Sequence, residues 1–394
     1  MTDLERFRLE TREWLEANCP PGARGSGPVS IGSRSLDLGE DVRAWLERMA
    51  ERGWTVPTWP VEYGGADLDR DRYRVLIEEL TRIDARPPLS GRGVNYIGPT
   101  LLEYGTDEQK SRWLPQIARG DGAWAMGYSE PGAGSDLASL SCKAVLEGDH
   151  YRINGSKIWT SDAVDCDYIF VLVRTSPDKR KHEGISLMLV DMDQPGVKVN
   201  PIRLLSGASP FCETVFDDAV ARADDVVGGV DNGWTVGKRL LQFERSTHAG
   251  INISGSQGGR SEQSRVPALV RTYAGTTADG RIADAALRSR LARFVMNDRA
   301  QQLTQKRAVE ELKSRAPGFT SSAVKLTGAL LKQEGDEMLV AAMGVRMLGA
   351  DASFDSTELA AQRNWLYGKS LTIAGGTKEV QKNIIAKRVL GLPD

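Results

Sequence analysis

Two changes in hydrophobic spacing divide this chain into three blocks, and they limit its fold more than any other feature of the sequence. Residues 1–120 contain segments such as VRAWLERMAERG, with apolar residues three and four positions apart, which is typical of amphipathic helices. Residues 121–228 contain the β-rich runs DYIFVLVRT and GISLMLVDM, each bounded by turn residues. Helical spacing returns over residues 229–394. The sequence therefore predicts an α+β protein in which two helical domains flank a central β-domain.

Glycine, proline and asparagine mark breaks within these blocks. The tract from Pro20 to Gly39 is rich in Gly, Pro and Ser, so we expect a connecting loop there. In the β-rich block, the pair Asn154-Gly155 within YRINGSKIW is a strong hairpin signal. It predicts a tight turn between two strands at that point.

Composition excludes several classes of function. The 394 residues carry a net charge of −2, with no basic excess of the kind that binds nucleic acid. No apolar run is long enough for a membrane span, and the charged start MTDLERFRLE does not resemble a signal peptide, so we expect a cytoplasmic protein. The four cysteines and three histidines are scattered without metal-ligand spacing, which argues against a metal site or a disulfide framework.

Two hydroxyl-bearing strings in the β-rich block are suited to hold a flat ring along its polar edge. The first is WAMGYSEPGAGSDL, from Trp124, and the second is NGSKIWTSDA, from Asn154. In the first string, Gly132, Ala133 and Gly134 let backbone N–H groups come close to a ligand. Together, and in this order, the strings resemble the flavin-binding segments of the acyl-CoA dehydrogenase family. Further family landmarks follow in family order, such as LLQFERS and AGGTKEVQKNIIAKRVLGLP.

The resemblance covers nearly the whole chain and implies a tertiary structure. It predicts the acyl-CoA dehydrogenase fold, in which FAD lies between a central β-barrel-like domain and a C-terminal four-helix bundle. It also implies α,β-dehydrogenation of an acyl-CoA thioester to a 2,3-enoyl-CoA, with the β-hydrogen leaving as hydride to flavin N5. An electron-transfer flavoprotein is the expected electron acceptor.

The resemblance assigns the cofactor contacts residue by residue. Tyr128 and Ser129 are expected along the pyrimidine side of the flavin, Trp159 against the isoalloxazine, and Ser161 near N5. Without the flanking motif, Trp159 reads equally well as a core aromatic of a β-sandwich. The remaining predicted cofactor contacts are Met126, Thr160, Gly376, Thr377 and Glu379. Ser135 matches a position on the CoA side of the substrate, whereas Asp136 is expected to brace its own loop.

The general base is the residue in which the chain departs from many family members. Those members carry a Glu in a YEGT-like string near the C-terminus, and here that position is Gly375. A subset that includes isovaleryl and long-chain types places the Glu before an Arg on a C-terminal helix, and this chain has Glu244-Arg245 there. We therefore predict that Glu244 is the base and that Arg245 lies beside the substrate. The alternative is that the two residues form a solvated helix face.

The run Ala374-Gly375-Gly376 permits two interpretations. Because relatives place Tyr and Glu there, the missing side chains favour a wide acyl pocket and a bulky or branched acyl group, such as a steroid side chain. In this interpretation Ala374 and Gly375 line the substrate. Alternatively, the two glycines only supply the turn before a helix that Thr377 caps.

A second departure concerns the subunit interface. Homotetrameric relatives complete each FAD site with an Arg and Phe, and with two Gln residues, from the neighbouring subunit. Here Arg271 lacks the following Phe-Gly, and the Gln positions fall near Leu291 and Arg346. The chain is thus predicted to pair with a related chain in an α2β2 heterotetramer, or to form a homo-oligomer whose contacts have changed.

Other functional readings keep the same fold. Reduced flavin could react with oxygen, as in short acyl-CoA oxidases or flavin monooxygenases, although monooxygenases of this shape usually have no need of the carboxylate at Glu244. A structural subunit without catalysis would need to retain none of Ser129, Trp159, Ser161 and Glu244. The sequence thus favours an FAD-dependent acyl-CoA dehydrogenase.

Overall fold

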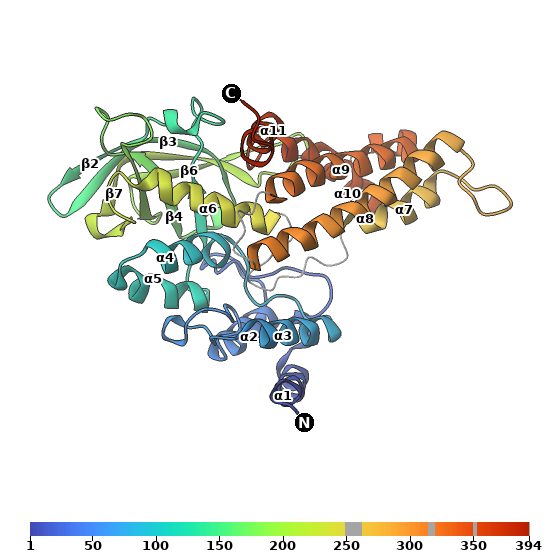
Figure 1. Ribbon diagram of the computed structural model, residues 1–394, viewed down its shortest axis with the longest axis horizontal. Coiled ribbons are helices and arrows are strands. Elements are labelled where there is room, and N and C mark those ends of the chain that lie inside the picture. Colours follow the sequence, from blue (N-terminus) through green and yellow to red (C-terminus); the bar gives the residue numbers. More distant parts are fainter. Residues whose placement is uncertain (249–261, 314–319, 350–352, 394) are drawn as a thin grey trace. The chain divides into compact units, whose positions relative to one another are not determined.

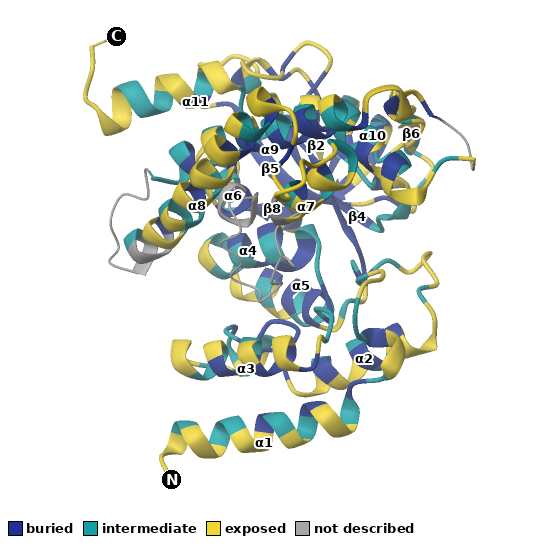
Figure 2. Ribbon diagram, turned by 90° about the vertical axis from the view of Figure 1, so that its right-hand side faces the viewer, coloured by how far each residue is buried: buried dark blue, intermediate teal, exposed yellow. Residues whose placement is uncertain are grey.

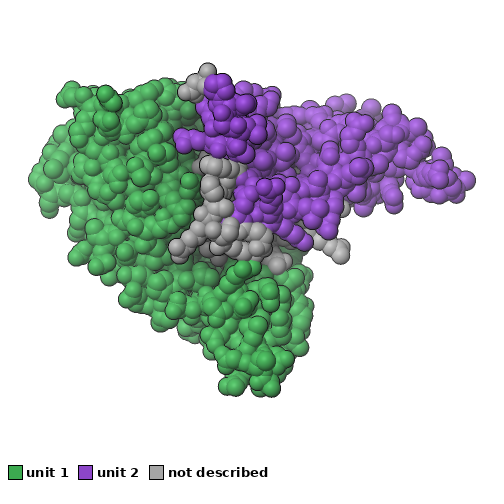
Figure 3. Space-filling view, in the orientation of Figure 1, with its two compact units in different colours: residues 1–203, 209–244, 252–257 green, residues 204–208, 245–251, 258–394 purple. Residues whose placement is uncertain are grey.

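The backbone of this protein divides into two compact units, which Figure 3 colours separately. The computed structural model describes residues 1–248, 262–313, 320–349 and 353–393, without the side chains of 245–248, 262–264, 309–310 and 312–313. Unit 1 contains residues 1–203 and 209–244, and unit 2 contains 204–208, 245–248 and the described residues from 262 onward.

Unit 1 begins with five helices whose ends follow local sequence rules. Thr2 and Thr106 each accept a backbone N–H three residues on, and the Glu5 and Gln109 side chains return the bond, so both helix starts are capping boxes. Gly120 ends the last of these helices in the left-handed conformation. The helices are α1 (Asp3–Asn18), α2 (Glu40–Glu51), α3 (Arg70–Arg82), α4 (Gly98–Tyr104) and α5 (Asp107–Arg119).

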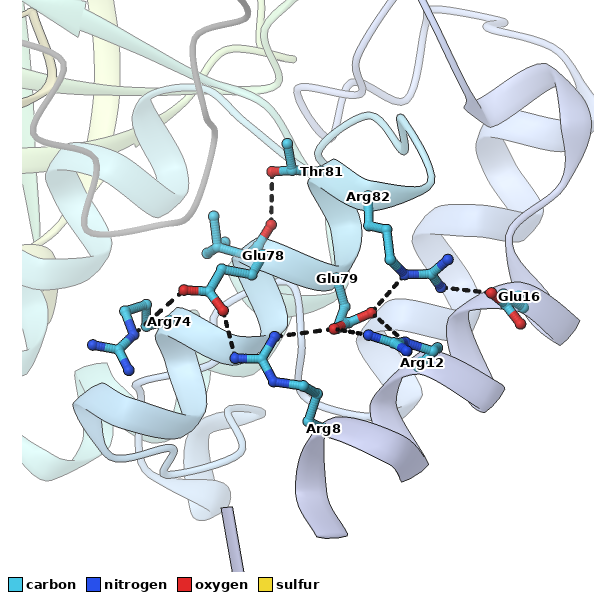
Figure 4. Close-up of polar contacts among 9 residues, drawn as sticks. Arg8, Arg12, Glu16, Arg74, Glu78, Glu79, Thr81 and Arg82 are labelled. Atoms are coloured by element: carbon cyan, nitrogen blue, oxygen red, sulfur yellow. Dashed lines mark hydrogen bonds and ion pairs between the residues drawn. The ribbon is translucent and has the colours of Figure 1, made fainter. Parts of the chain in front are cut away.

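A buried carboxylate joins α1 to α3. Glu79, on α3, is 1% exposed and accepts hydrogen bonds from Arg8 and Arg12 of α1 and from Arg82. Figure 4 shows the three guanidinium groups converging on this carboxylate. Hydrogen bonding to Arg12 is the largest of the effects that lower the pKa of Glu79 to about 2. The cluster thus adds a polar anchor to helix α1 (Figure 2), which also buries Thr11 and Leu15.

The Glu79 cluster predicts a pH-dependent contribution to stability. Because the pKa of Glu79 is lowered from an ordinary 4.5 to about 2, its contribution is complete above pH ~4.5 and is lost as the pH falls toward 2. We expect Glu79→Gln to reduce the free energy of unfolding at pH 7 by about 2 kcal/mol, after allowing for partly exposed arginines. Urea denaturation of both proteins from pH 7 to pH 3 measures the difference.

The neighbouring residue Glu78 supplies the control. Its side chain is 44% exposed and pairs with Arg8 and Arg74. Exposed pairs contribute about 0–1 kcal/mol, so Glu78→Gln should cost little at any pH. If the destabilisation by Glu79→Gln did not shrink at acid pH, the lowered pKa of Glu79 would be contradicted.

A mixed β-sheet forms the second half of unit 1 (Figure 1). Its strands follow the order β6-β7-β3-β2-β4-β5-β8, and β1 pairs in parallel with β4. The central strands β4 and β5 are buried along almost their whole length, which explains their continuous apolar sequences. The strands are β1 (Trp124–Gly127), β2 (Lys143–Glu147), β3 (His150–Ser161), β4 (Tyr168–Arg174), β5 (Ile185–Asp191), β6 (Val197–Ile202), β7 (Phe211–Arg222) and β8 (Val226–Val227).

The prediction of a hairpin turn at Asn154-Gly155 is wrong. Strand β3 runs straight through these residues, and the turn lies earlier, at Gly148, where φ is +67° and Glu147 pairs with His150. Gly155 instead lies at a β-bulge, and a Cβ there would stand 2.8 Å from the Cα of Cys142. Glycine is therefore needed for the close approach of Cys142, the residue before β2, and not for a turn.

Helix α6 (Gly233–His248) packs within unit 1 as far as Glu244. Its buried residues Val236 and Leu240 share a core with strand residues and with Leu101 of α4. Arg239 also donates two hydrogen bonds to Glu103 of α4. By its backbone contacts, most of the helix groups with the sheet.

Unit 2 is built around helix α9, which contacts each of the other four helices. Its core joins Val266, Phe294 and Met338, which come from three helices. Gly335 permits this packing, since a Cβ there would stand 3.2 Å from both Phe294 and Val266. The helices are α7 (Glu262–Tyr273), α8 (Ala285–Lys313), α9 (Thr320–Met343), α10 (Ser356–Gly368) and α11 (Lys378–Ile384).

The predicted fold is confirmed in its main parts. Helices precede and follow a central sheet, as the hydrophobic spacing indicates. The tract from Pro20 to Gly39 is a connection with one short 3₁₀ turn, Pro21–Ala23. Among the helices that the structure describes, none combines the length and the apolar character needed to cross a bilayer.

Candidate functional site

The first hydroxyl-bearing string begins on β1 and continues into a loop beside β3. Met126 is half-buried on the strand, and Tyr128, just after it, is buried in the core. Ser129 is partly exposed, and its carbonyl accepts a 2.8 Å hydrogen bond from the backbone N–H of Ile158. Since Ile158 belongs to the second string, the two strings lie side by side in the fold.

A buried ion pair fastens the two strings together. Lys157, in the second string, is 0% exposed and donates a 2.7 Å bond to Glu130, in the first. The same ammonium group donates to the carbonyl of Tyr128. Both charged groups are removed from water, so each depends on the other to offset its cost of burial.

Glu130 has further donors that hold it in place. Its carboxylate accepts bonds from the backbone N–H groups of Ser141 and Cys142 and from the Ser141 hydroxyl. Burial alone would raise the pKa of Glu130, but the charge of Lys157 and these donors hold the pKa below its ordinary value. The carboxylate is therefore ionised at neutral pH and fixes the backbone on both sides of Ser129.

Trp159 is turned outward by an irregularity in β3. The register of β3 against β7 shifts between Ile158 and Thr160, and Trp159 itself has φ of +63°. Such a backbone costs of order 1–3 kcal/mol for a bulky residue and is often found at functional sites. As a result Trp159 is 53% exposed, and the centroid of its ring lies 6.0 Å from that of Phe211. It is available to cover a flat ring and is not a core aromatic.

The residues after Trp159 face in different directions. The Thr160 hydroxyl is buried and bonds to the carbonyl of Cys212 and the hydroxyl of Thr214, so only its backbone is left to meet a ligand. Ser161 is partly exposed. Next to it, Asp162 pairs at 3.2 Å with Arg92, which fixes this end of the strand to the helical part of unit 1.

The loop that carries Ser135 is open at its glycines. Gly132 and Gly134 are exposed, and a Cβ at either would meet nothing within 4 Å. Ser135 is exposed as well. Asp136 accepts hydrogen bonds from Ser139 and from Lys181, which confirms that it braces its own loop.

Glu244 lies in the buried part of unit 1 and not on a solvated helix face. It is 7% exposed. Burial, and then the negative charge of Glu244, raise the pKa of two buried phenols, Tyr96 and Tyr128. Tyr96 belongs to a π-helical turn, Gly93–Ile97, a conformation that is frequent at functional sites. The side chain of Arg245 lies outside the described residues. Glu244 is thus a sequestered carboxylate close to the first string.

The C-terminal candidates lie in unit 2, before and at the start of α11. Gly375 and Gly376 have φ of +64° and +96°, which favours the conformational reading of the glycine pair. Thr377 caps α11 by accepting the backbone N–H of Val380, as predicted. Ala374 and Glu379 are exposed. Gly376 accepts a bond from Lys325 through its carbonyl.

The unit 1 residues fit a flavin. They provide an exposed indole, partly exposed serine hydroxyls at positions 129 and 161, and backbone free of side chains at Gly132 and Gly134. A flat ring with a polar edge needs this combination of an aromatic face and hydrogen-bonding groups. The buried Lys157–Glu130 pair keeps the two halves of the surface in register.

Sequence reasoning missed the residues that hold this site together. Lys157 and Glu130 are charged residues within the two strings, and charged residues of this kind are mostly solvated. Tyr96 and Arg92 come from a distant segment, so only the tertiary contacts place them here. The apolar pair Ile158-Trp159, directly after Lys157, was the one local signal of burial.

Three domain descriptions of one family match consecutive parts of the chain. Residues 2–121 match "Acyl-CoA dehydrogenase, N-terminal domain", residues 125–219 match "Acyl-CoA dehydrogenase, middle domain", and residues 231–390 match "Acyl-CoA dehydrogenase, C-terminal domain". The matches follow the helical, β and helical blocks in order. Together they span nearly the whole sequence.

Individual proteins of known name agree with these matches. The chain is 38% identical to acyl-CoA dehydrogenase IpdE1 of Mycobacterium tuberculosis, over 100% of this chain and 99% of the relative. The solved Tcur3481-Tcur3483 steroid ACAD is similar with a TM-score of 0.76 and 31% identity, over 99% of this chain and 97% of the other. The ChsE4-ChsE5 complex of Mycobacterium tuberculosis follows, with a TM-score of 0.73, 29% identity and coverage of 100% and 98%.

Proposed function

The chain belongs to the acyl-CoA dehydrogenase family of flavin-dependent oxidoreductases, and we propose that it uses FAD to convert an acyl-CoA thioester to the 2,3-enoyl-CoA. The observation that carries this proposal is that unit 1 contains both an exposed indole, Trp159, at an irregularity in β3, and a buried carboxylate, Glu244. An aromatic face for a redox ring and a carboxylate for proton removal are the two elements that α,β-dehydrogenation needs.

The residues of unit 1 have separate proposed roles in binding the cofactor, removing the proton and binding the substrate. Ser129 and Ser161 supply hydroxyls to the polar edge of the cofactor, and Trp159 covers its ring. When bound, FAD supplies the hydride acceptor for the β-hydrogen. Glu244 removes the α-proton, and its burial keeps water away from the carboxylate. Ser135, on the open loop, meets the CoA side of the substrate. Gly376, Thr377 and Glu379 stay predicted cofactor contacts.

The proposed acyl group is bulky and derived from a steroid. Among similar proteins, the Tcur3481-Tcur3483 enzyme is a steroid ACAD at 31% identity over nearly the whole chain. The run Ala374-Gly375-Gly376 is compatible with a large acyl group, because no side chain beyond a methyl extends from it. Arg245 remains a proposed neighbour of the substrate.

We further propose a heteromeric assembly with a related chain, and an electron-transfer flavoprotein as acceptor. The position where relatives carry a cofactor-binding Gln is here near Leu291, which is 7% exposed in the core of unit 2. At the second such position, Arg346 pairs with Glu358. Leu291 therefore offers no polar group to a neighbour's flavin site, and Arg346 is already bonded to Glu358. The ChsE4-ChsE5 relative is itself a complex of two chains.

Purification with and without a related subunit tests the function and the assembly together. We expect the chain alone to carry much less than one FAD, because its partner's half of the site is missing. Co-expression with a related chain should restore stoichiometric FAD and a heterotetrameric mass. Flavin absorbance is then expected to bleach on addition of a steroid-derived acyl-CoA.

Other outcomes separate the two claims. Near-stoichiometric FAD in a homo-oligomer of this chain alone, bleached by acyl-CoA, would contradict the heteromeric proposal and leave the dehydrogenase reaction supported. A fully loaded enzyme that no acyl-CoA bleaches would contradict the reaction itself. Peroxide released on mixing with acyl-CoA in air would identify an oxidase.

A further inference from the structure

A buried phenol near Glu244 is left without a hydrogen-bond partner. Tyr128 is 4% exposed, and within the described part of the chain its hydroxyl bonds to no other group. A buried hydroxyl without a partner is desolvated without compensation, a cost that phenylalanine would avoid. Such a group calls for an explanation, and an acceptor on a bound molecule is one.

The hydroxyl of Tyr128 lies against a part of α6 that lacks a side chain. A Cβ on Gly237 would stand 3.4 Å from the Tyr128 oxygen and 3.4 Å from Leu172. Gly237 and Glu244 are seven residues apart, so both lie on the buried face of α6, about 10 Å from each other along the helix. The Tyr128 hydroxyl and Glu244 therefore lie on the same face of α6, at positions two turns apart along the helix.

The phenol is a hydrogen-bond donor at neutral pH. Burial, and then the negative charge of Glu244, raise the pKa of Tyr128 well above its ordinary value. The O–H thus stays protonated and can offer its hydrogen to an acceptor. The pKa of Tyr96 is raised in the same way, by burial and then by the charge of Glu244.

We propose that Tyr128 donates a hydrogen bond to a keto or hydroxyl oxygen on the acyl group of the substrate, remote from the thioester. This inference rests on the proposed function, because Glu244 as base places the α-carbon at its own level of α6. Measured along α6, a substrate oxygen about 10 Å from the α-carbon lies at the level of Gly237, where the Tyr128 hydroxyl is. The thioester carbonyl is bonded to the α-carbon and so stays near Glu244. The preferred substrate is thus an oxygenated acyl-CoA and not a plain hydrocarbon one.

A matched pair of thioesters tests the assignment on the FAD-loaded enzyme. The pair is 3-(4-oxocyclohexyl)propanoyl-CoA and 3-cyclohexylpropanoyl-CoA, which differ by one remote oxygen. We expect Tyr128→Phe to lower kcat/KM and to weaken binding for the keto thioester on the order of tenfold, because one donor is lost. The hydrocarbon thioester offers the hydroxyl no acceptor, so its loss should be much smaller and the ratio of kcat/KM between the two thioesters should fall; the melting temperature should be unchanged or higher.

A second buried tyrosine provides the control. Tyr151 is 5% exposed and belongs to the other core of the sheet, so Tyr151→Phe should leave the ratio between the two thioesters unaltered. Equal losses for both thioesters in Tyr128→Phe, or no loss for either, would overturn the proposal. If the wild-type enzyme oxidised neither thioester, the proposed reaction would fail, while the two dissociation constants, measured by calorimetry, would still decide the role of Tyr128.

Discussion

Replacing Glu244 with glutamine is expected to abolish nearly all dehydrogenation while FAD stays bound. Glutamine keeps the size and polarity of the side chain but cannot accept the α-proton. Loss of a general base typically lowers the rate by about 10²–10⁴-fold. Stopped-flow bleaching of the flavin by acyl-CoA measures the chemical step directly, and the FAD-to-protein ratio shows whether the site is intact.

A carboxylate bound to the same helix gives the matched control. Glu103 holds α6 through its two hydrogen bonds from Arg239, and it is exposed. Glu103→Gln should therefore leave bleaching within a few-fold of the wild-type rate, since it perturbs α6 without touching the proposed base. Substantial turnover in Glu244→Gln would place the base elsewhere.

Breaking the Lys157–Glu130 pair should have the largest effect on stability. In Lys157→Met the Glu130 carboxylate stays buried without its counter-charge, and removing one partner of a buried pair costs about 3–5 kcal/mol. Because this pair joins the strings that carry Ser129 and Trp159, FAD should be lost as well. Urea denaturation, followed by fluorescence and by release of flavin, measures both effects.

An exposed lysine in the same sheet controls for this change. Lys143, on β2, faces solvent, so Lys143→Met should alter stability by no more than about 0.5 kcal/mol. The double variant Lys157→Met with Glu130→Leu should be more stable than Lys157→Met alone, because no buried charge remains. Equal stability of the Lys157→Met and Lys143→Met proteins would show that the buried pair contributes nothing.

Local patterns in the sequence determined the block structure and several details. Apolar spacing separated helical from β-rich segments, because each residue's face on a helix or strand depends on its near neighbours. The cap at Thr377 and the brace at Asp136 also involve residues within a few positions, and both are confirmed. The two strings in family order were enough to predict the fold and the flavin-dependent class.

The tertiary structure alone decided what holds and completes the site. Asn154-Gly155 has the local chemistry of a turn, yet β3 continues through both residues, and Gly155 lies at a bulge against β7, close to Cys142. The Lys157–Glu130 pair and the reach of Glu244's charge to Tyr128 depend on contacts between separate elements. Such contacts are set by strand register and helix packing, which spacing along the chain does not encode. For this reason the sequence could name the residues of the site, while only the fold showed which of them act on one another.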